Sequence, residues 1–220
     1  MKKTFILSNW KSNKTVLQTE EWVRDFVNSS YNLEKNKKII VCPPFTSLYR
    51  LKLLAQENNL NIKLGAGNVS PFDQGAYTGE INAKQIKELA DYVIIGHSER
   101  RKNFLESDEI LERKVDLAKT NSLISIFCVQ GKNTVIPKNA DIILYEPIDA
   151  IGTGIPDDPK NANEVAEFIK NNNSVKVVLY GGSINSENVL SFTSMPYIDG
   201  IGVGTASLDA SSFLEVINNA

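Results

Sequence analysis

The sequence predicts one α/β domain, residues 1–220, folded as a closed (β/α)8 barrel. Eight short runs rich in β-branched residues recur at nearly regular intervals, and helical patterns lie between them without a linker or a composition break. The runs are apolar almost throughout, which is typical of parallel strands buried on both faces. We expect strands at 5–7, 39–41, 62–64, 92–95, 123–129, 142–145, 177–180 and 201–203.

The alternative architecture is an open, doubly wound sheet. That fold usually carries a glycine-rich phosphate turn after its first strand. Here the first strand runs into Ser-Asn-Trp-Lys at residues 8–11, which is no such turn. The closed barrel is therefore favoured.

Three of the intervening helices have clear starts. Thr15 and Gln18 have the spacing of a capping box. Ser107 precedes two acidic residues that suit the positive end of a helix dipole. Asp158 and Pro159 give an N-cap followed by proline at the first helical position.

The interval between the fifth and sixth strands is unusually short. Residues 130–140 contain Gly131 and Pro137 and cannot hold a full crossover helix. We therefore expect the helix between strands 5 and 6 to be reduced or absent.

A missing helix would leave one face of these two strands without its usual cover. Alternation points Phe127, Ile143 and Tyr145 outward, and the short connection offers only Val135 and Ile136 to cover them. Either the flanking helices shift inward or a second dimer docks there to give a tetramer. The tetramer is slightly favoured.

Composition excludes several classes of function. The formal net charge is −2, so no basic excess favours nucleic acid or an anionic membrane, and the apolar runs are too short to span a bilayer. The N-terminus lacks the long apolar stretch of a signal peptide. Cys42 and Cys128 each end an apolar run, which favours buried thiols and a cytoplasmic location. His97 is the single histidine, so a histidine-rich metal site is excluded.

Polar residues follow several of the expected strands. Because barrel active sites lie at the C-terminal ends of the strands, these residues should meet at one mouth. Each residue type alone is more often structural or solvated, but one cation, one imidazole and one carboxylate on one face predict an active site. Glycine-rich turns on the side of strands 7 and 8 suit a phosphate. The expected site comprises Asn9, Lys11, His97, Glu146 and the turns at 181–183 and 202–206.

Seven motifs occur in order at these barrel positions. The chain thereby resembles the triosephosphate isomerase family nearly end to end. The motifs lie at 9–11 (Asn-Trp-Lys), 43–46 (Pro-Pro-Phe-Thr), 75–81 (Gly-Ala-Tyr-Thr-Gly-Glu-Ile), 96–101 (Gly-His-Ser-Glu-Arg-Arg), 145–147 (Tyr-Glu-Pro), 150–154 (Ala-Ile-Gly-Thr-Gly) and 180–183 (Tyr-Gly-Gly-Ser).

The resemblance implies interconversion of dihydroxyacetone phosphate and glyceraldehyde 3-phosphate, without a metal or an organic cofactor. Glu146 would be the base and His97 a neutral electrophile, kept neutral by the N-terminus of a short helix that begins after it. Lys11 would supply positive charge and Asn9 a hydrogen bond to the substrate. Glu99 would orient Lys11.

The resemblance also implies a phosphate site and a lid. Donors would come from Gly152, Ser183, Gly204 and Thr205, and Tyr180 would hold the lid when it closes. The implied lid comprises Pro147, Ile148, Asp149, Ala150, Ile151, Gly152, Thr153 and Gly154.

The family pattern further implies assembly of identical subunits. The segment from Asn68 to Glu80 would protrude into a neighbouring subunit, where Thr78 would meet the active site near Asn9. We therefore expect a homodimer or a homotetramer.

The chain differs from the family pattern at the lid hinge and at one phosphate turn. The hinge usually reads Pro-Val-Trp, but here Asp149 stands where the tryptophan is expected. The glutamate that usually partners this tryptophan is replaced by Gly131. Thr205 replaces a glycine of the phosphate turn, with its N–H retained. These changes concern lid kinetics and phosphate affinity more than the chemistry.

Two other functions are alternatives to isomerisation. An aldolase would want a lysine within a barrel strand, and an epimerase commonly uses paired acids or metal ligands; neither pattern is evident. A catalytically impaired barrel that binds sugar phosphates is the remaining alternative. It would need no carboxylate at the reacting carbon, so the presence of Glu146 argues against it.

Overall fold

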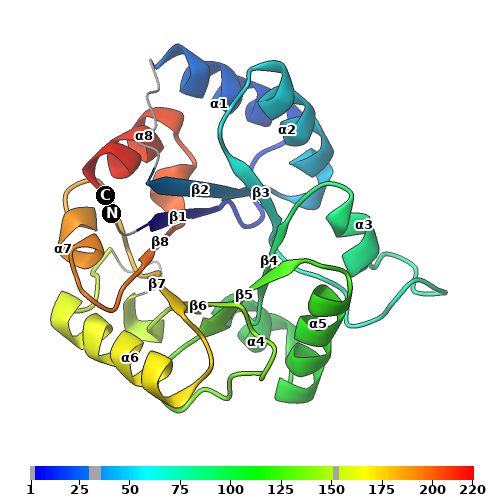
Figure 1. Ribbon diagram of the computed structural model, residues 1–220. Coiled ribbons are helices and arrows are strands. Elements are labelled where there is room, and N and C mark those ends of the chain that lie inside the picture. Colours follow the sequence, from blue (N-terminus) through cyan, green and yellow to red (C-terminus); the bar gives the residue numbers. More distant parts are fainter. Residues whose placement is uncertain (1–2, 30–35, 151–153) are drawn as a thin grey trace.

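The fold is a closed barrel of eight parallel strands in the order β1 to β8, surrounded by helices (Figure 1). The computed structural model describes residues 3–29, 36–150 and 154–220. The predicted (β/α)8 barrel is confirmed. The strands are β1 (Thr4–Asn9), β2 (Lys37–Cys42), β3 (Lys63–Ala66), β4 (Tyr92–Ile95), β5 (Ile124–Val129), β6 (Ile142–Tyr145), β7 (Val177–Tyr180) and β8 (Gly200–Val203).

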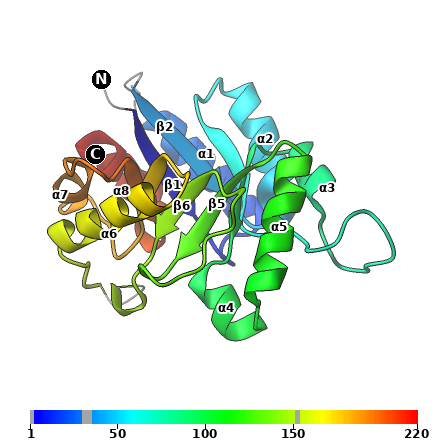
Figure 2. The same ribbon diagram turned by 60° about the horizontal axis from the view of Figure 1, so that its bottom comes forward.

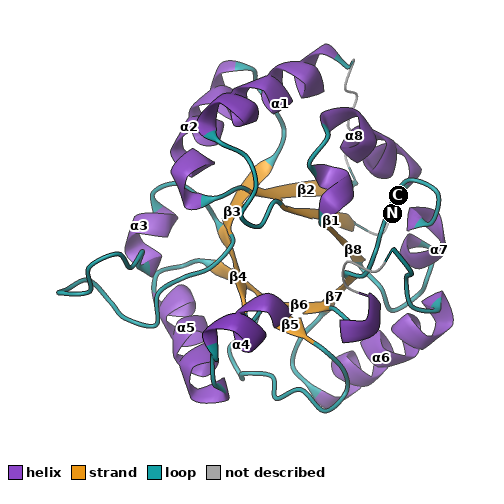
Figure 3. Ribbon diagram, turned by 180° about the vertical axis from the view of Figure 1, so that it is seen from behind, coloured by secondary structure: helices purple, strands orange, loops and turns teal. Residues whose placement is uncertain are grey.

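Helices cover the outside of this ring of strands, as Figure 3 shows from the opposite side. They are α1 (Val16–Asn28), α2 (Phe45–Glu57), α3 (Ala83–Lys87), α4 (Ser98–Phe104), α5 (Asp108–Thr120), α6 (Pro159–Asn172), α7 (Val189–Thr193) and α8 (Ala210–Asn219), with 3-10 turns η1 (Ile148–Ala150) and η2 (Thr205–Ser207).

The three predicted helix starts are confirmed. The Thr15 hydroxyl accepts the N–H of Gln18, and the Gln18 side chain accepts the N–H of Thr15 in return. Ser107 and Asp158 likewise accept N–H groups from the first turns of α5 and α6. Side-chain caps therefore set these boundaries.

Strand β3 lies further along the chain than expected. It includes Gly65 and Ala66, which pair with Tyr92 and Val93. A Cβ on Gly65 would lie 2.5 Å from the Cys42 Sγ, so a glycine is needed where this strand meets its neighbour. Glycine and alanine lack the large apolar side chains by which strands are recognised in a sequence. The predicted strand 62–64 therefore stopped short of Ala66.

Strand alternation produces two apolar layers. Side chains such as Leu7, Ile94 and Leu144 fill the barrel interior, while Ile143 and Tyr145 belong to the outer layer beneath the helices. Leu144 therefore points inward, and Glu146, two residues later, continues on the inner side at the mouth.

The barrel closes between its first and last strands. Phe5 pairs with Gly200, and a Cβ on Gly200 would lie 2.0 Å from the Phe5 carbonyl oxygen. Only glycine allows the two strands to approach this closely.

No helix lies between β5 and β6, as predicted, and Figure 2 shows the pair flanked by α5 and α6. Phe127, Ile143 and Tyr145 point outward but are buried within the single chain. The connection spans the gap: Asn139 donates to Asp116 of α5 at 2.9 Å, and the Lys132 ammonium lies over the Phe168 ring of α6.

The outer face is therefore covered within one chain, which agrees with the first of the two expected covers, the flanking helices. Ile136 packs against the outer layer, whereas Val135 is 62% exposed. The flanking helices and one isoleucine cover the two strands without a second dimer. This removes the reason for favouring a tetramer.

We expect Ile136→Asp to lower the free energy of unfolding by about 2–3 kcal/mol, because a carboxylate would be placed against apolar side chains. The adjacent Val135→Asp should change it by no more than about 0.5 kcal/mol, since that side chain is already in water. Urea denaturation followed by circular dichroism measures both. Equal losses for the two variants would contradict this packing.

Candidate active site

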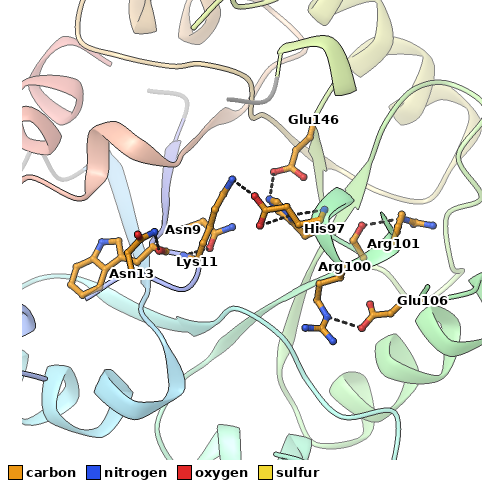
Figure 4. Close-up of polar contacts among 11 residues, drawn as sticks. Asn9, Lys11, Asn13, His97, Arg100, Arg101, Glu106 and Glu146 are labelled. Atoms are coloured by element: carbon orange, nitrogen blue, oxygen red, sulfur yellow. Dashed lines mark hydrogen bonds and ion pairs between the residues drawn. The ribbon is translucent and has the colours of Figure 1, made fainter. Parts of the chain in front are cut away.

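The predicted polar residues meet in one cavity at the C-terminal mouth (Figure 4). Asn9 ends β1, Lys11 follows it, His97 follows β4, and Glu146 follows β6. The cavity has a volume of about 370 Å³. Its opposite wall is formed by residues 181–185 and 202–206, which include the two glycine-rich turns.

Lys11 has a strained backbone and a fixed side chain. Its φ angle is 53°, in the left-handed region that costs a residue with a Cβ about 1–2 kcal/mol. The Lys11 N–H donates to the Asn9 Oδ1 at 3.0 Å, and the Lys11 Nζ lies 2.6 Å from the Glu99 Oε1. Glu99 is thus placed to orient the ammonium group.

The lysine also lies against a phosphate turn. A Cβ built on Gly204 would lie 3.9 Å from the Lys11 Cε. The stem of the lysine therefore lies close to Gly204, where the turn that begins η2 starts.

The tautomer of His97 follows from the helix it begins. His97 is the N-cap of α4, and its Nδ1 accepts the Glu99 N–H at 3.2 Å. An accepting Nδ1 carries no proton, so the ring proton of the neutral form is on Nε2. That Nε2 lies 3.3 Å from the Glu146 Oε1.

The sequence predicted a neutral His97 ring from the helix N-terminus alone, but Glu146 also acts on the pKa of this ring. Burial lowers this pKa, but the hydrogen bond and the negative charge of Glu146 outweigh burial and raise it above its usual 6.5. A substrate lying between the two side chains would separate them. Burial and the helix N-terminus would then favour the neutral ring.

We expect Glu146→Gln to lower the pKa of His97 relative to the unmodified protein. The substitution removes the charge that raises this pKa and leaves the burial that lowers it. Because His97 is the only histidine, a pH titration of ¹⁵N-histidine-labelled protein follows it without overlap. An unchanged or raised midpoint would contradict the assigned cause.

Glu146 is a buried carboxylate with unused hydrogen-bonding capacity. The residue is 5% exposed, and its Oε2 has no hydrogen-bond partner among the residues that the structure describes. An under-solvated carboxylate at the wall of a cavity is suited to accept a proton from a bound molecule.

Cys128 lies beside this carboxylate on the inner face of β5. Burial above all, with the charge of Glu146, raises the pKa of its thiol. Burial also raises the pKa of Cys42, and both cysteines are free. The prediction of buried thiols is confirmed, and neither thiol is ionised at neutral pH.

Ser183 connects the two described ends of the expected lid. Its hydroxyl accepts the Gly154 N–H at 3.1 Å and donates to the Ala150 carbonyl at 2.7 Å. The φ angle of Ser183 is 49°, so its backbone is also in the left-handed region. Its hydroxyl is therefore engaged by the lid, which leaves its backbone N–H as the group available to a phosphate.

The comparisons with known proteins agree with this geometry. The family model described as triosephosphate isomerase matches residues 4–220. The chain belongs to the triosephosphate isomerase family. The triosephosphate isomerase of Aquifex aeolicus is 38% identical, with 96% of this chain and 97% of that protein covered. Those of Dictyoglomus thermophilum and Trichodesmium erythraeum are 38% and 36% identical, with 100% and 99% of each chain covered.

The lid expected from the family motif is described in part. Residues 147–150 and 154 are described, and the first part ends in the single turn η1. Ile151, Gly152 and Thr153 lie outside the described residues, so the donor expected from Gly152 stays a prediction.

Tyr180 lies where the family motif predicts it, at the far end of the lid. Its hydroxyl accepts the Asp157 N–H at 2.8 Å, and burial raises its pKa to about 12. Asp157 also accepts the Tyr145 hydroxyl at 3.2 Å through its carboxylate. Two tyrosines on neighbouring strands thus hold the segment that follows the lid.

Thr78 does not line the cavity of its own chain, and among the other described residues of the expected site neither Glu99 nor residues 147–150 line it. Thr78 lies on the exposed segment between β3 and α3, which projects from the barrel (Figures 1 and 2). Stacking of Phe72 on Tyr77, with ring centroids 4.2 Å apart, gives this projection internal order.

The structure adds site residues that the motifs did not single out. Leu144 and Asn185 line the cavity, and Cys128 lies close enough to Glu146 for its thiol to feel the carboxylate charge. Alternation along β5 and β6 places Cys128 and Leu144 on the inner face, so this signal was present in the sequence. Asn185 carries no comparable signal.

Within residues 3–29, 36–150 and 154–220, no helix is long and apolar enough to cross a membrane. The same ranges hold no group of three or more histidine, cysteine, aspartate or glutamate side chains arranged to hold a metal ion.

Proposed function

We propose that this protein interconverts dihydroxyacetone phosphate and glyceraldehyde 3-phosphate through an enediolate. The observation that carries the proposal is the pairing of the His97 Nε2 with the Glu146 Oε1, 3.3 Å apart, beside a lysine in one cavity. A base, a hydrogen-bond donor and a cation are the groups needed to move a proton next to a carbonyl. Membership of the triosephosphate isomerase family supports the same substrate.

Glu146 begins the reaction as the base. Its carboxylate takes a proton from the carbon next to the carbonyl, and the electron pair of that C–H bond forms the C=C bond of the enediolate. The carbonyl π pair moves to oxygen as negative charge. The proton then returns from Glu146 to the former carbonyl carbon, where the C=C π pair forms the new C–H bond. The hydroxyl on the neighbouring carbon gives up its proton, which ends on the former carbonyl oxygen, and the O–H electron pair forms the new C=O bond of the isomer.

His97 and Lys11 stabilise the charge that develops on oxygen. The Nε2–H of His97 donates to the enediolate oxygens, and the Lys11 ammonium adds positive charge on the side of the phosphate. Asn9 donates a hydrogen bond to a substrate oxygen. Glu99 holds the ammonium in place through the 2.6 Å ion pair.

The phosphate is bound on the wall formed by the two glycine-rich turns. Backbone N–H groups of Ser183, Gly204 and Thr205 supply donors, and Lys11 supplies charge. The Cβ of Thr205 does not remove its N–H. The reaction needs no cofactor, because the base and the electrophile are both side chains.

A coupled assay on the purified protein tests the proposal. Glyceraldehyde 3-phosphate is supplied, and the dihydroxyacetone phosphate formed is reduced by a dehydrogenase that consumes NADH. Turnover supports the isomerase. Binding of the substrate without turnover would favour the catalytically impaired alternative. A protein that neither binds nor turns over the substrate would exclude both the isomerase and the impaired barrel.

The proposal includes a homodimer in which the Thr78 segment reaches the neighbouring active site. A second cavity of about 370 Å³ adjoins the site and supports this, because Asn9, Lys11, His97 and Glu99 all contribute to its wall. An exposed, projecting segment and an open recess beside the catalytic groups are complementary features. The buried outer face of β5 and β6 gives no support for a tetramer.

We expect excision of the projecting segment to give a monomer of low activity. The Ser70 N–H donates to the Ile81 carbonyl at 2.9 Å, so residues 71–80 can be replaced by two glycines without moving the ends. Light scattering coupled to size exclusion gives the mass, and the coupled assay gives kcat. A fully active monomer would show that the neighbour contributes nothing.

A further inference from the structure

Arg101 uses all three guanidinium nitrogens on three different elements. Its Nε donates to the Gly96 carbonyl at 2.9 Å, its Nη1 to the Asp108 carboxylate at 3.0 Å, and its Nη2 to the Cys128 carbonyl at 3.5 Å. The guanidinium carbon lies 5.4 Å from the centre of the Phe127 ring. The side chain is 19% exposed, so most of this fixed, planar group is withdrawn from water.

The two carbonyl contacts occur where the strand pairing stops. The register of β4 with β5 ends at Ile95 and Phe127, and the next residues are Gly96 and Cys128. Strand carbonyls that continue past the ladder need another donor. Arg101 supplies one to each, and so holds the ends of the two strands together beyond their last pairing.

Both strand ends lead directly to the reacting pair. Gly96 precedes His97, and Cys128 lies close enough to Glu146 for its carboxylate to raise the pKa of the thiol. Glu146 is also fixed to this strand end, because its N–H donates to the Val129 carbonyl at 2.8 Å. The distance between the His97 Nε2 and the Glu146 Oε1 therefore depends on how the ends of β4 and β5 are held.

We propose that Arg101 is a positioning residue that fixes the imidazole of His97 relative to the carboxylate of Glu146. It touches neither the cavity nor the phosphate turns, so it acts on the reaction only through these two side chains. The effect belongs to the transition state rather than to substrate binding, because reacting groups displaced by about 1 Å can cost on the order of 100-fold in rate. This inference rests on the proposed isomerase function.

The test compares Arg101→Met and Arg101→Lys with the unmodified full chain in the coupled assay. We expect Arg101→Met to lower kcat by about 10–100-fold with KM within about twofold, because the phosphate site is untouched. Lysine reaches only one acceptor at a time, so the kcat of Arg101→Lys should lie between that of Arg101→Met and that of the unmodified chain. ¹⁵N NMR of the single histidine should show the tautomer and the pKa of His97 changed in both variants.

Two controls distinguish a positioning effect of Arg101 from the effect of losing its ion pair with Asp108 and from the effect of losing one positive charge. Asp108→Asn removes the carboxylate partner but leaves both carbonyl contacts, and Arg24→Met removes an exposed arginine of α1. Both should keep kcat within about twofold. A loss for Asp108→Asn as large as that for Arg101→Met would overturn the proposal in favour of the ion pair.

The proposal is also overturned if folded Arg101→Met retains kcat within about twofold, or if KM rises in step with the loss of kcat. Unchanged His97 resonances would overturn it as well. If Arg101→Met fails to fold, the same readouts on Arg101→Lys decide. If the unmodified protein shows no isomerase turnover, the proposed function fails, while the NMR comparison still decides whether Arg101 sets the state of His97.

Discussion

Glu146→Gln should lower kcat by about three orders of magnitude, within the 10²–10⁴ range expected for a general base, and leave the fold intact. The amide keeps the shape of the side chain but cannot accept the proton from carbon. Among the described residues the Glu146 Oε2 has no hydrogen-bond partner, so replacing it breaks no hydrogen bond there and the substitution should be mild for stability. The coupled assay and circular dichroism measure the two effects.

Glu164→Gln is the matched control, since Glu164 is exposed on α6 and away from the cavity. It should leave both kcat and the melting temperature unchanged. A folded Glu146→Gln protein that keeps more than about a tenth of the original kcat would remove Glu146 from the role of base.

Lys11→Met should lower kcat by about 100-fold and raise KM by at least about tenfold. One ammonium lies beside both the phosphate turn and the reacting groups, so its loss weakens the binding of the substrate and the stabilisation of the transition state together. Methionine has a Cβ as lysine does and adds no new backbone strain at φ 53°. The change in kinetics can therefore be assigned to the lost charge.

Lys102→Met serves as its control, because Lys102 is an exposed lysine of α4 outside the cavity. It tests whether lowering the net positive charge near the mouth is enough to change kcat and KM without the loss of Lys11. If Lys11→Met left KM and kcat unchanged, the ammonium would have no role in binding or turnover.

Much of the fold was predictable because its signals are local. Runs such as Ile142–Tyr145 are long and apolar enough to identify as buried strands, and caps such as Thr15 and Ser107 fix helix starts through contacts within one turn. The end of β3 was not predictable in this way. Gly65 packs closely against Cys42 and Tyr92, and Ala66 pairs with Val93, so both depend on residues that are distant in the sequence.

The site residues were predictable as a set because barrel topology brings strand ends together. Their electrostatics were not. The sequence places His97 at a helix N-terminus, which favours the neutral ring. Only the folded chain shows that the Glu146 Oε1 lies 3.3 Å from the His97 Nε2, and this carboxylate raises the pKa of the ring instead. The sequence also left two covers open for Ile143, the flanking helices or a second dimer, because the packing of residues distant in the chain decides between them.

Arg101 shows a similar limit. Its place in the Gly-His-Ser-Glu-Arg-Arg segment marks it as part of a motif, but its acceptors are main-chain carbonyls. Carbonyl groups are present at every residue, so no side-chain pattern reveals which of them a given arginine will reach.

The pairing of Phe5 with Gly200 has a consequence for synthesis in the cell. Strand β1 leaves the ribosome long before its second partner, because it pairs with β8, which follows only after the other six strands. At about 5–20 residues per second, one edge of β1 stays unpaired for roughly 10–40 s. This apolar edge can pair with other nascent chains during that time. Replacing Gly200 by any residue with a side chain would extend this exposure indefinitely, so its first consequence in cells should be aggregation of newly made protein.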